Sequence, residues 1–146
     1  MIVRYAPPEH HGWIIGRAGL CPPIHAIEAV DDAGRIHGMV AYTGWTPGAV
    51  MLHIALDNPA ALRHLLRPGF NVAFAEPGGS PPGHGRSVAT CVVLSTNKRS
   101  LALVRRLGFR EVFRGRHWWD RGVDMVWFEM RREDCRFIES RRKAVA

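Results

Sequence analysis

The stretch Leu94–Phe109, which reads LSTNKRSLALVRRLGF, carries the clearest structural signal in this sequence. The residues that precede it, Ser87–Leu94, are rich in β-branched side chains and predict a buried strand. Asn97 is a favoured helix N-cap, and Gly108 is a favoured residue just after a helix ends. Apolar residues recur at helical spacing between these two positions, at Leu101, Val104 and Leu107. The stretch therefore predicts a strand, a helix over Asn97–Leu107 and the start of another strand.

Beyond this helix, the sequence predicts a β-hairpin and then a basic tail. Phe109–Trp118 and Val123–Met130 have strand character, and Asp120-Arg121-Gly122 between them is typical of a turn. Tryptophans and arginines are interleaved here, a combination that can stack on and clamp nucleic acid. For Trp127, packing against the sheet is the simpler interpretation. The basic tail covers residues 139–146.

Upstream of the same helix, the sequence predicts three strands and a longer helix. Ala26–Asp31 and Arg35–Thr43 indicate paired strands, and the alternating apolar residues of Val50–Leu56 indicate a central strand. Asn58-Pro59 then favours the start of a helix. Pro68-Gly69 predicts a kink or break in that helix, with a second segment after it.

The remaining segments are a short helix and a loop. Glu9–Arg17 predicts the helix, which Gly19 would close. Pro77–Arg86 is rich in proline and glycine and indicates a flexible loop. Its last residues, Gly83-His84-Gly85-Arg86, look like a phosphate-binding loop but precede a strand instead of opening a helix, so a mobile loop is the simpler interpretation.

This succession of elements resembles the second half of the GNAT-type N-acetyltransferase fold. The resemblance rests on Asn97-x-x-Ser100 at the start of the helix and Leu107-Gly108-Phe109 at its end. Glu133–Phe137 also resembles the closing segment of a phage and prophage branch of that superfamily. The match spans roughly residues 26–138.

The resemblance implies an α/β (α+β) fold, with a mixed, mostly antiparallel central sheet, a splayed parallel pair of strands and helices on both faces. A chain of 146 residues has the length of one domain, so we expect a single GNAT-like domain over 1–146. Within it, 1–25 corresponds to the variable N-terminal segment that helps to shape the acceptor pocket in the family.

The resemblance also implies a cosubstrate, acetyl-CoA, whose pantetheine arm would lie between the strands Met51–Leu56 and Val88–Leu94. Asn97 matches the family asparagine that contacts this arm, although a helix cap explains the same residue without a cofactor. The residues expected to bind acetyl-CoA are Leu52, Ile54, Leu56, Ala60, Ala61, Leu62, Arg63, Asn97 and Ser100.

Two positions depart from the family pattern. The family carries glycines where the central strand meets the cofactor helix, and Leu56–Arg63 contains none, with the acidic Asp57 at the place of the phosphates. The helix start is still expected to offer free N–H groups at residues 60–62. Val104 stands seven residues after Asn97, where the family often has a tyrosine that protonates the leaving thiolate.

Three residues are candidates for the base that accepts the proton of the amine: His53, Glu28 and Asp57. His53 lies mid-strand beside the expected thioester, and a packed or hydrogen-bonded histidine is the alternative. Glu28 corresponds to a family carboxylate that orders water, and an outward-facing carboxylate is equally compatible. The histidines lack partners at metal-ligand spacing, so we expect no metal.

Charge and cysteine usage bear on partners and location. Up to Ser95, six arginines balance six acidic residues, whereas the remainder carries fourteen basic against seven acidic residues, and so the whole net charge of +7. A basic face formed by this last part of the chain would attract polyanions. A solvated, arginine-rich surface explains the excess of basic residues equally well. The cysteines are three, widely spaced and odd in number, which favours a reduced, cytoplasmic protein, and no apolar run is long enough to span a membrane.

The sequence therefore predicts an acyl-CoA-dependent N-acetyltransferase in which a primary amine attacks the thioester directly. The amine acceptor, a small molecule or peptide, is not specified by the sequence. Two alternatives stay open: a catalytically silent interaction protein on the same fold, and a protein that binds or modifies nucleic acid. A homodimer through the tryptophan-rich hairpin is also compatible with the sequence.

Overall fold

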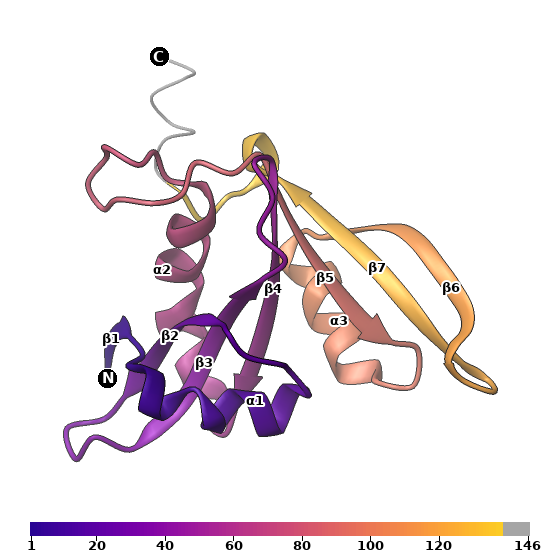
Figure 1. The fold of residues 1–146 in the computed structure, drawn as a ribbon, viewed down its shortest axis with the longest axis horizontal. Helices are drawn as coiled ribbons and strands as arrows, with labels where there is room; N and C mark the ends of the chain where they lie inside the picture. The colour runs from indigo at the N-terminus through magenta and orange to yellow at the C-terminus, as the bar shows by residue number, and fades with distance from the viewer. Residues whose placement is uncertain (139–146) are drawn as a thin grey trace.

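The computed structural model describes residues 1–138, which form one seven-stranded mixed sheet with three α-helices (Figure 1). The predicted basic tail, 139–146, lies outside the described residues. The strands are β1 (Ile2–Tyr5), β2 (His25–Val30), β3 (Ile36–Thr43), β4 (Ala49–Leu56), β5 (Val88–Leu94), β6 (Arg110–Asp120) and β7 (Val123–Arg131). The helices are α1 (Gly12–Ala18), α2 (Leu62–Phe74) and α3 (Lys98–Leu107), with short 3₁₀ turns η1 (Pro8–His10), η2 (Pro59–Ala61) and η3 (Arg132–Asp134).

The sheet has the strand order β1-β2-β3-β4-β5-β7-β6. All neighbouring strands pair antiparallel except β4 and β5, which run parallel. A parallel pair needs a crossover connection, and α2 supplies it. The predicted fold class, with a mostly antiparallel sheet and a splayed parallel pair, is therefore confirmed.

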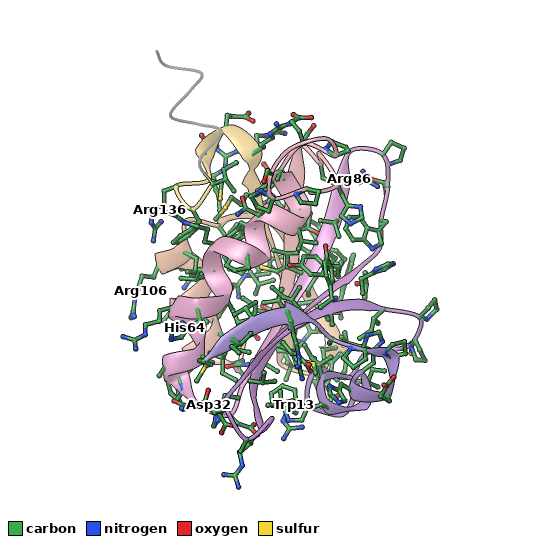
Figure 2. All side chains as sticks on the ribbon, turned by 90° about the vertical axis from the view of Figure 1, so that its left-hand side faces the viewer. Trp13, Asp32, His64, Arg86, Arg106 and Arg136 are labelled. Atoms are coloured by element: carbon green, nitrogen blue, oxygen red, sulfur yellow. The ribbon has the colours of Figure 1, made fainter. Side chains whose placement is uncertain are left out.

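The helices lie on both faces of the sheet, as predicted. The larger core lies between the sheet and the helices α2 and α3, and contains Leu65, Phe74, Leu101 and Phe128. A smaller cluster lies on the opposite face, where Ile14 of α1 packs beside residues of β2 and β3. Figure 2 looks at the sheet from the β1 side and shows α2 and α1 on opposite sides of it, with Trp13 on the α1 side.

Helix α2 corrects the prediction of a break, because it runs continuously through Pro68. The residues after the proline, which were expected to form a second segment, continue the same helix and are buried in the larger core. The Tyr42 hydroxyl also donates a hydrogen bond of 2.7 Å to the Gly69 carbonyl, which ties this turn of the helix to β3. Burial against the sheet therefore outweighs the cost of the missing proline N–H.

The strand β1 was missed by the sequence analysis. Its four residues pair with β2 in register from Ile2, opposite Val30, to Tyr5, opposite Ile27. The strand forms one edge of the sheet, and most of its residues are exposed. Its two consecutive β-branched residues, Ile2 and Val3, favour a strand, but a run of four residues gives little periodicity.

The loop 77–86 also differs from its prediction. The amides of His84, Gly85 and Arg86 donate to the carbonyls of Val72, Ala75 and Ala73, so the end of the loop closes the C-terminus of α2. These N–H groups are satisfied by helix carbonyls at the negative end of the helix dipole, where an anion is disfavoured. The segment Gly83–Arg86 is thus a helix-closing turn whose N–H groups are not open to a phosphate.

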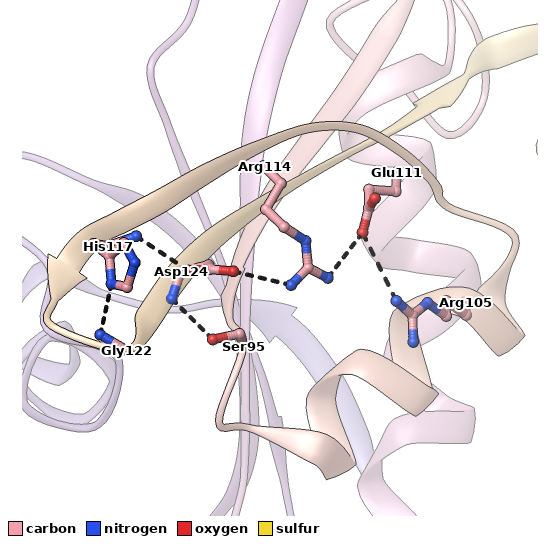
Figure 3. Close-up of polar contacts among 7 residues, drawn as sticks. All are labelled: Ser95, Arg105, Glu111, Arg114, His117, Gly122 and Asp124. Carbon is pink, nitrogen blue, oxygen red and sulfur yellow. Dashed lines mark hydrogen bonds and ion pairs between the residues drawn. The ribbon is translucent and has the colours of Figure 1, made fainter.

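The β6–β7 hairpin is confirmed, and a polar network runs from its turn toward α3 (Figure 3). The Asp124 carboxylate accepts hydrogen bonds from the His117 amide, at 3.0 Å, and from Arg114, at 3.1 Å. The Asp124 amide in turn donates to Ser95 Oγ, just after β5, at 2.8 Å. Arg114 also pairs with Glu111, which lies 3.8 Å from Arg105 of α3. The network therefore joins the hairpin to the strand and helix beside it.

Candidate functional site

The parallel pair β4–β5 is joined over only three residue pairs, Ala49–Met51 with Val88–Thr90. Beyond them the two strands continue separately, β4 to Leu56 and β5 to Leu94, and Figure 1 shows them diverging. Alternate backbone N–H and C=O groups of β4 point away from β3, and over residues 52–56 they have no strand partner on that side. We call this divergence the slot.

The closed end of the slot is held by backbone hydrogen bonds. The Gly48 carbonyl accepts from the amides of Ser87 and Val88, at 2.9 and 3.1 Å. On its other flank, β5 pairs with β7 along its whole length, from Val88 to Leu94. The slot therefore opens from this vertex between two strands that are paired on their outer sides, β4 with β3 over residues 51–56 and β5 with β7 over its whole length.

His53 lies on β4 where the slot opens, two residues beyond the last pair with β5. Its side chain is half-buried, and Nε2 shares a hydrogen bond of 2.7 Å with Oγ1 of Thr43 on β3. Desolvation by burial lowers the pKa of His53 below its ordinary value of 6.5, so the ring is neutral at pH 7. When Nε2 donates its proton to Thr43, the lone pair of Nδ1 is free to accept a proton.

On the face covered by α2, the wall of the slot is apolar. Leu52 and Ile54 of β4 line a small apolar cleft together with Leu62 and Leu66 of α2. Ile54, Leu56 and Leu66 are only partly buried against the core. These partly covered side chains are where an alkyl chain inserted into the slot would find contact. The structure thus brings together Leu52, Ile54, Leu56 and Leu62 of the predicted cofactor residues.

The start of α2 corrects the prediction of free N–H groups at residues 60–62. The Ala60 amide donates to Oδ1 of Asn58 at 3.0 Å, and the Ala61 amide donates to the Asn58 carbonyl at 2.9 Å. The Leu62 amide donates to the Pro59 carbonyl. A 3₁₀ turn precedes the helix here, and its tighter bonds use the N–H groups that an α-helix start would leave open. Arg63, one turn in, is exposed, and its Nε donates to the neighbouring His64 ring at 3.3 Å.

Asp57, at the end of β4, is held by Arg17 of α1. Nε and Nη2 of Arg17 reach the two carboxylate oxygens at 3.1 and 2.9 Å. The guanidinium also lies over the Trp13 ring, 3.8 Å from its centroid. Asp57 is therefore paired with a cation beside the start of α2. It follows the end of β4 that is far from the vertex, away from His53.

Glu28 is fully buried, which excludes the outward-facing alternative. Its oxygens are 2.9 Å from Nε of Arg4 and 2.8 Å from Nδ1 of His10, so both are already paired. The carboxylate lies on β2 opposite Met39, which in turn lies opposite Ala55 of β4. Glu28 is thus about 10 Å, two strand spacings, from the strand that borders the slot.

At the start of α3, Asn97 caps the helix. Its side-chain oxygen accepts a hydrogen bond from the amide of Ser100 at 3.2 Å. The helix-cap interpretation is therefore confirmed, and the side-chain NH₂ group of Asn97 stays available to a ligand. Val104 is buried and carries no proton donor.

Cys91 of β5 is the cysteine nearest the slot in sequence, and it faces the larger core. Burial raises the pKa of its thiol to about 12. A thiol of this kind stays protonated and is not a nucleophile at neutral pH. The chemistry available at the slot is therefore proton transfer at His53, without a covalent cysteine intermediate.

The sequence did not point to two side chains beside the candidate residues, Thr43 and Arg17, and it left the direction of Trp127 open. Trp127 points away from the core that holds Val126 and Phe128, because it alternates with them along β7. Its indole N–H is buried without a partner among the described residues. Strand alternation could have revealed Trp127, whereas Thr43 and Arg17 needed the pairing of β3 with β4 and the position of α1.

Comparisons with known proteins agree with this architecture. The sequence matches no protein-family model and no curated protein. The structure is similar to spermidine/spermine N-acetyltransferase from Vibrio cholerae, with 11% identity, a TM-score of 0.66 and coverage of 90% of this chain and 92% of that one. It is also similar to a proposed phosphinothricin N-acetyltransferase, with 14% identity, a TM-score of 0.66 and coverage of 89% and 97%.

A dodecameric structure of spermidine N-acetyltransferase from Vibrio cholerae gives a TM-score of 0.69 at 10% identity, with coverage of 90% of this chain and 94% of that one. Identities this low establish the fold and leave the chemistry to be argued from the residues. The chain has the fold of the GNAT-type N-acetyltransferases.

Proposed function

We propose that this protein is an acyl-CoA-dependent N-acetyltransferase that transfers an acetyl group to a primary amine. The observation that carries the proposal is the slot: three parallel pairs between β4 and β5, and then divergence beside His53. Unpaired backbone groups along the edge of β4 are suited to hydrogen-bond an extended amide-containing arm, as a further strand would be. The phage and prophage branch remains a prediction.

In this proposal, acetyl-CoA supplies an activated acyl group as a thioester. Nδ1 of His53 accepts the proton that the attacking amine loses, while Thr43 holds the ring through Nε2. Backbone N–H groups of β4 at the opening polarise the acyl carbonyl. Val104 donates no proton, so the leaving thiolate takes its proton from water. Glu28 and Asp57 act as structural carboxylates, because both are paired.

The fit to acetyl-CoA differs along the molecule. The backbone of β4 and the apolar side chains beside it suit the pantetheine arm. The start of α2 does not suit a diphosphate, because its first amides are satisfied internally and Asp57 lies beside them. We therefore expect the arm, and not the phosphates, to supply most of the affinity.

Calorimetry with acetyl-CoA and with S-acetylpantetheine, which lacks the nucleotide, tests this proposal. The expected result is binding of both ligands, with dissociation constants within about tenfold of each other. Release of free thiol in the presence of an amine then reports the transfer itself. The proposal is wrong if neither thioester binds at millimolar concentration.

One observation favours a second function, a catalytically silent interaction protein on the same fold. The amides of residues 60–62 at the start of α2 are all hydrogen-bonded within the protein. This is the arrangement expected of a protein that has lost a phosphate site. This alternative predicts a stable protein that binds no thioester. The nucleic-acid alternative is less favoured, because several basic residues of the last third are used internally: Arg105, Arg110, Arg114, Arg132 and Arg136.

Location and assembly stay predictions. The described cysteines Cys21, Cys91 and Cys135 are free thiols, which is compatible with the predicted cytoplasmic location. No helix among the described residues is long and apolar enough to cross a membrane. Analytical ultracentrifugation would test the predicted homodimer through the hairpin.

A further inference from the structure

A row of side chains crosses the face of the sheet that carries His53. Residues directly opposite each other in paired strands share a face. Two residues beyond the last pair, Met51–Thr90, Val92 of β5 lies on the same face of the sheet as His53, on the other side of the slot. Val92 lies opposite Trp127 of β7, and Trp127 lies opposite Phe113 of β6. From His53, the row therefore continues across the slot into two aromatic rings.

A second tryptophan joins these rings because Gly115 has no side chain. Gly115 lies opposite Met125, which is on the same face as Trp127. A Cβ atom at Gly115 would overlap the ring of Trp118, so Trp118 lies over this glycine. Its ring centroid is 5.1 Å from that of Phe113. Trp127, Phe113 and Trp118 together form what we call the aromatic row.

The aromatic row is open to solvent at its outer end. Phe113 is 49% exposed and Trp118 is 59% exposed. On this face α1 packs against β3 and β4, while α2 and α3 pack on the opposite face. Large aromatic rings exposed next to one another are unusual on a folded protein and mark a surface that binds something apolar.

The carboxylates around the slot are already paired with cations. On this face, Glu129 lies 3.2 Å from Arg110, and Glu28 is paired with Arg4 and His10. At the end of β4, Asp57 is paired with Arg17. Near the slot, a polycationic amine would therefore meet carboxylates that are already paired, and the chain itself carries a net charge of +7. Asp120, on the same face beside the turn of the hairpin, is exposed and forms no ion pair among the described residues. The surface therefore favours an acceptor with one positive charge and an apolar body.

We infer that the acceptor is an arylalkylamine, a primary amine with an aromatic body and a single positive charge. This inference rests on the proposed function. The amine nitrogen lies at the slot beside His53, and the ring lies along the aromatic row, beginning at Trp127. Trp127 lies one strand spacing, about 5 Å, beyond β5, the strand that borders the slot, so a ring on a two-carbon chain reaches it from that border.

Binding of three amines to the protein without acetyl-CoA tests the inference. The probes are 2-phenylethylamine, n-butylamine and spermidine, and the readout is the quenching of tryptophan fluorescence, checked by saturation-transfer NMR. The expected result is that 2-phenylethylamine binds at least fivefold more tightly than n-butylamine, because of its ring, and that spermidine binds most weakly. Equal or tighter binding of spermidine overturns the inference.

Three variants show where the ring binds. Phe113→Ala removes one ring of the aromatic row, and Gly115→Ala displaces Trp118 without deleting it. Each is expected to weaken the binding of 2-phenylethylamine about fivefold. Trp119→Ala is the matched control, since Trp119 is 63% exposed and lies in the same segment of β6 outside the row. The inference fails if Trp119→Ala weakens binding as much as Phe113→Ala does.

Thiol release with acetyl-CoA separates this inference from the proposed function. Binding of 2-phenylethylamine through the aromatic row without any thiol release would contradict the acetyltransferase and keep the amine site. Thiol release with spermidine or n-butylamine as the better acceptor would keep the acetyltransferase and contradict the aromatic acceptor.

Discussion

The strand β5 pairs with its two neighbours, β4 and β7, over different lengths. Its pairing with β7 covers seven residue pairs, from Val88 to Leu94, whereas its pairing with β4 stops after three. The same backbone therefore forms a complete ladder on one side and an opening on the other. The complete side carries the fold, and the open side is where backbone groups and His53 are left for a ligand.

The two sides also differ in what lies beside them. The β7 side is reinforced by the network around Asp124 and Arg114, which joins the hairpin to Ser95 (Figure 3). The β4 side is bordered by apolar side chains that are only partly buried. We expect changes on the β7 side to reduce stability, and changes on the β4 side to reduce activity.

The largest effect, on stability, is expected on the β7 side, for Phe128→Ala. Phe128 is 1% exposed and lies opposite Cys91 in the β5–β7 ladder. Removing a fully buried phenylalanine side chain costs about 3–5 kcal/mol of unfolding free energy, through lost contacts and the cavity left behind. Urea denaturation measures this loss. Phe113→Ala, in the same hairpin but exposed, is the control and should cost about 0.5 kcal/mol.

The next effect concerns the open side, where His53→Gln removes the candidate base. Loss of a general base lowers the rate about a hundredfold or more, with little change in stability. In the unaltered protein the rate should rise with pH through a pKa below 6.5 and be level at neutral pH, because burial disfavours the charged ring.

In His53→Gln, this acid limb of the pH profile should disappear. His37→Gln is the matched control, since His37 is a partly buried histidine on β3 that pairs with Asp31. A pH profile that keeps its acid limb in His53→Gln would exclude His53 as the base. Steady-state thiol release from pH 5 to 8 measures both variants.

A smaller effect is expected at the outer end of the open side, for Asp57→Asn. This change removes a negative charge beside the start of α2 and frees Arg17, to which Asp57 is bound at 2.9 Å. Because the pair is exposed, we expect acetyl-CoA to bind only about fivefold more tightly. Binding of S-acetylpantetheine should not change. Calorimetry measures both, with Asp32→Asn, at an exposed turn, as the control.

The smallest effect concerns the network of the β7 side, for Asp124→Asn. The His117 amide and the Arg114 guanidinium lower the pKa of Asp124 below its ordinary value of 3.8. Its carboxylate therefore stabilises the fold above that value, and the contribution is lost as the pH falls through the lower native pKa.

The expected result is a lower urea midpoint for Asp124→Asn than for the unaltered protein at pH 7. The two midpoints should converge once the pH is below the lowered native pKa, where the native carboxylate is protonated as well. A gap that stays constant with pH would mean that the loss comes from altered packing and not from the charge.

Much of the fold could be predicted from local residues. Asn97 and Gly108 mark the ends of α3, as their capping roles imply, and alternation along Val50–Leu56 gives β4. Two departures from the predictions share a cause, which is that tertiary contacts outweighed local preference. Pro68 does not break α2, because the residues after it are buried, and Gly83–Arg86 is ordered by carbonyls of a helix.

The site was predictable only in part. His53 and the apolar residues of β4 follow from the pattern of one strand. The partners that decide their roles come from elsewhere in the chain: Thr43 beside His53, Arg17 on Asp57 and Arg4 on Glu28. No local pattern encodes which distant side chain will meet a given carboxylate.

The sequence by itself determined most of the strands and helices of this protein and their order, with β1 as the exception, because caps, turns and periodicity act over a few residues. Only the tertiary structure decided that β4 leaves β5 after three pairs, that the first amides of α2 are already satisfied, and that Trp118 lies over Gly115. Each of these depends on contacts between segments far apart in the chain, whose geometry is set when the sheet and its helices pack together.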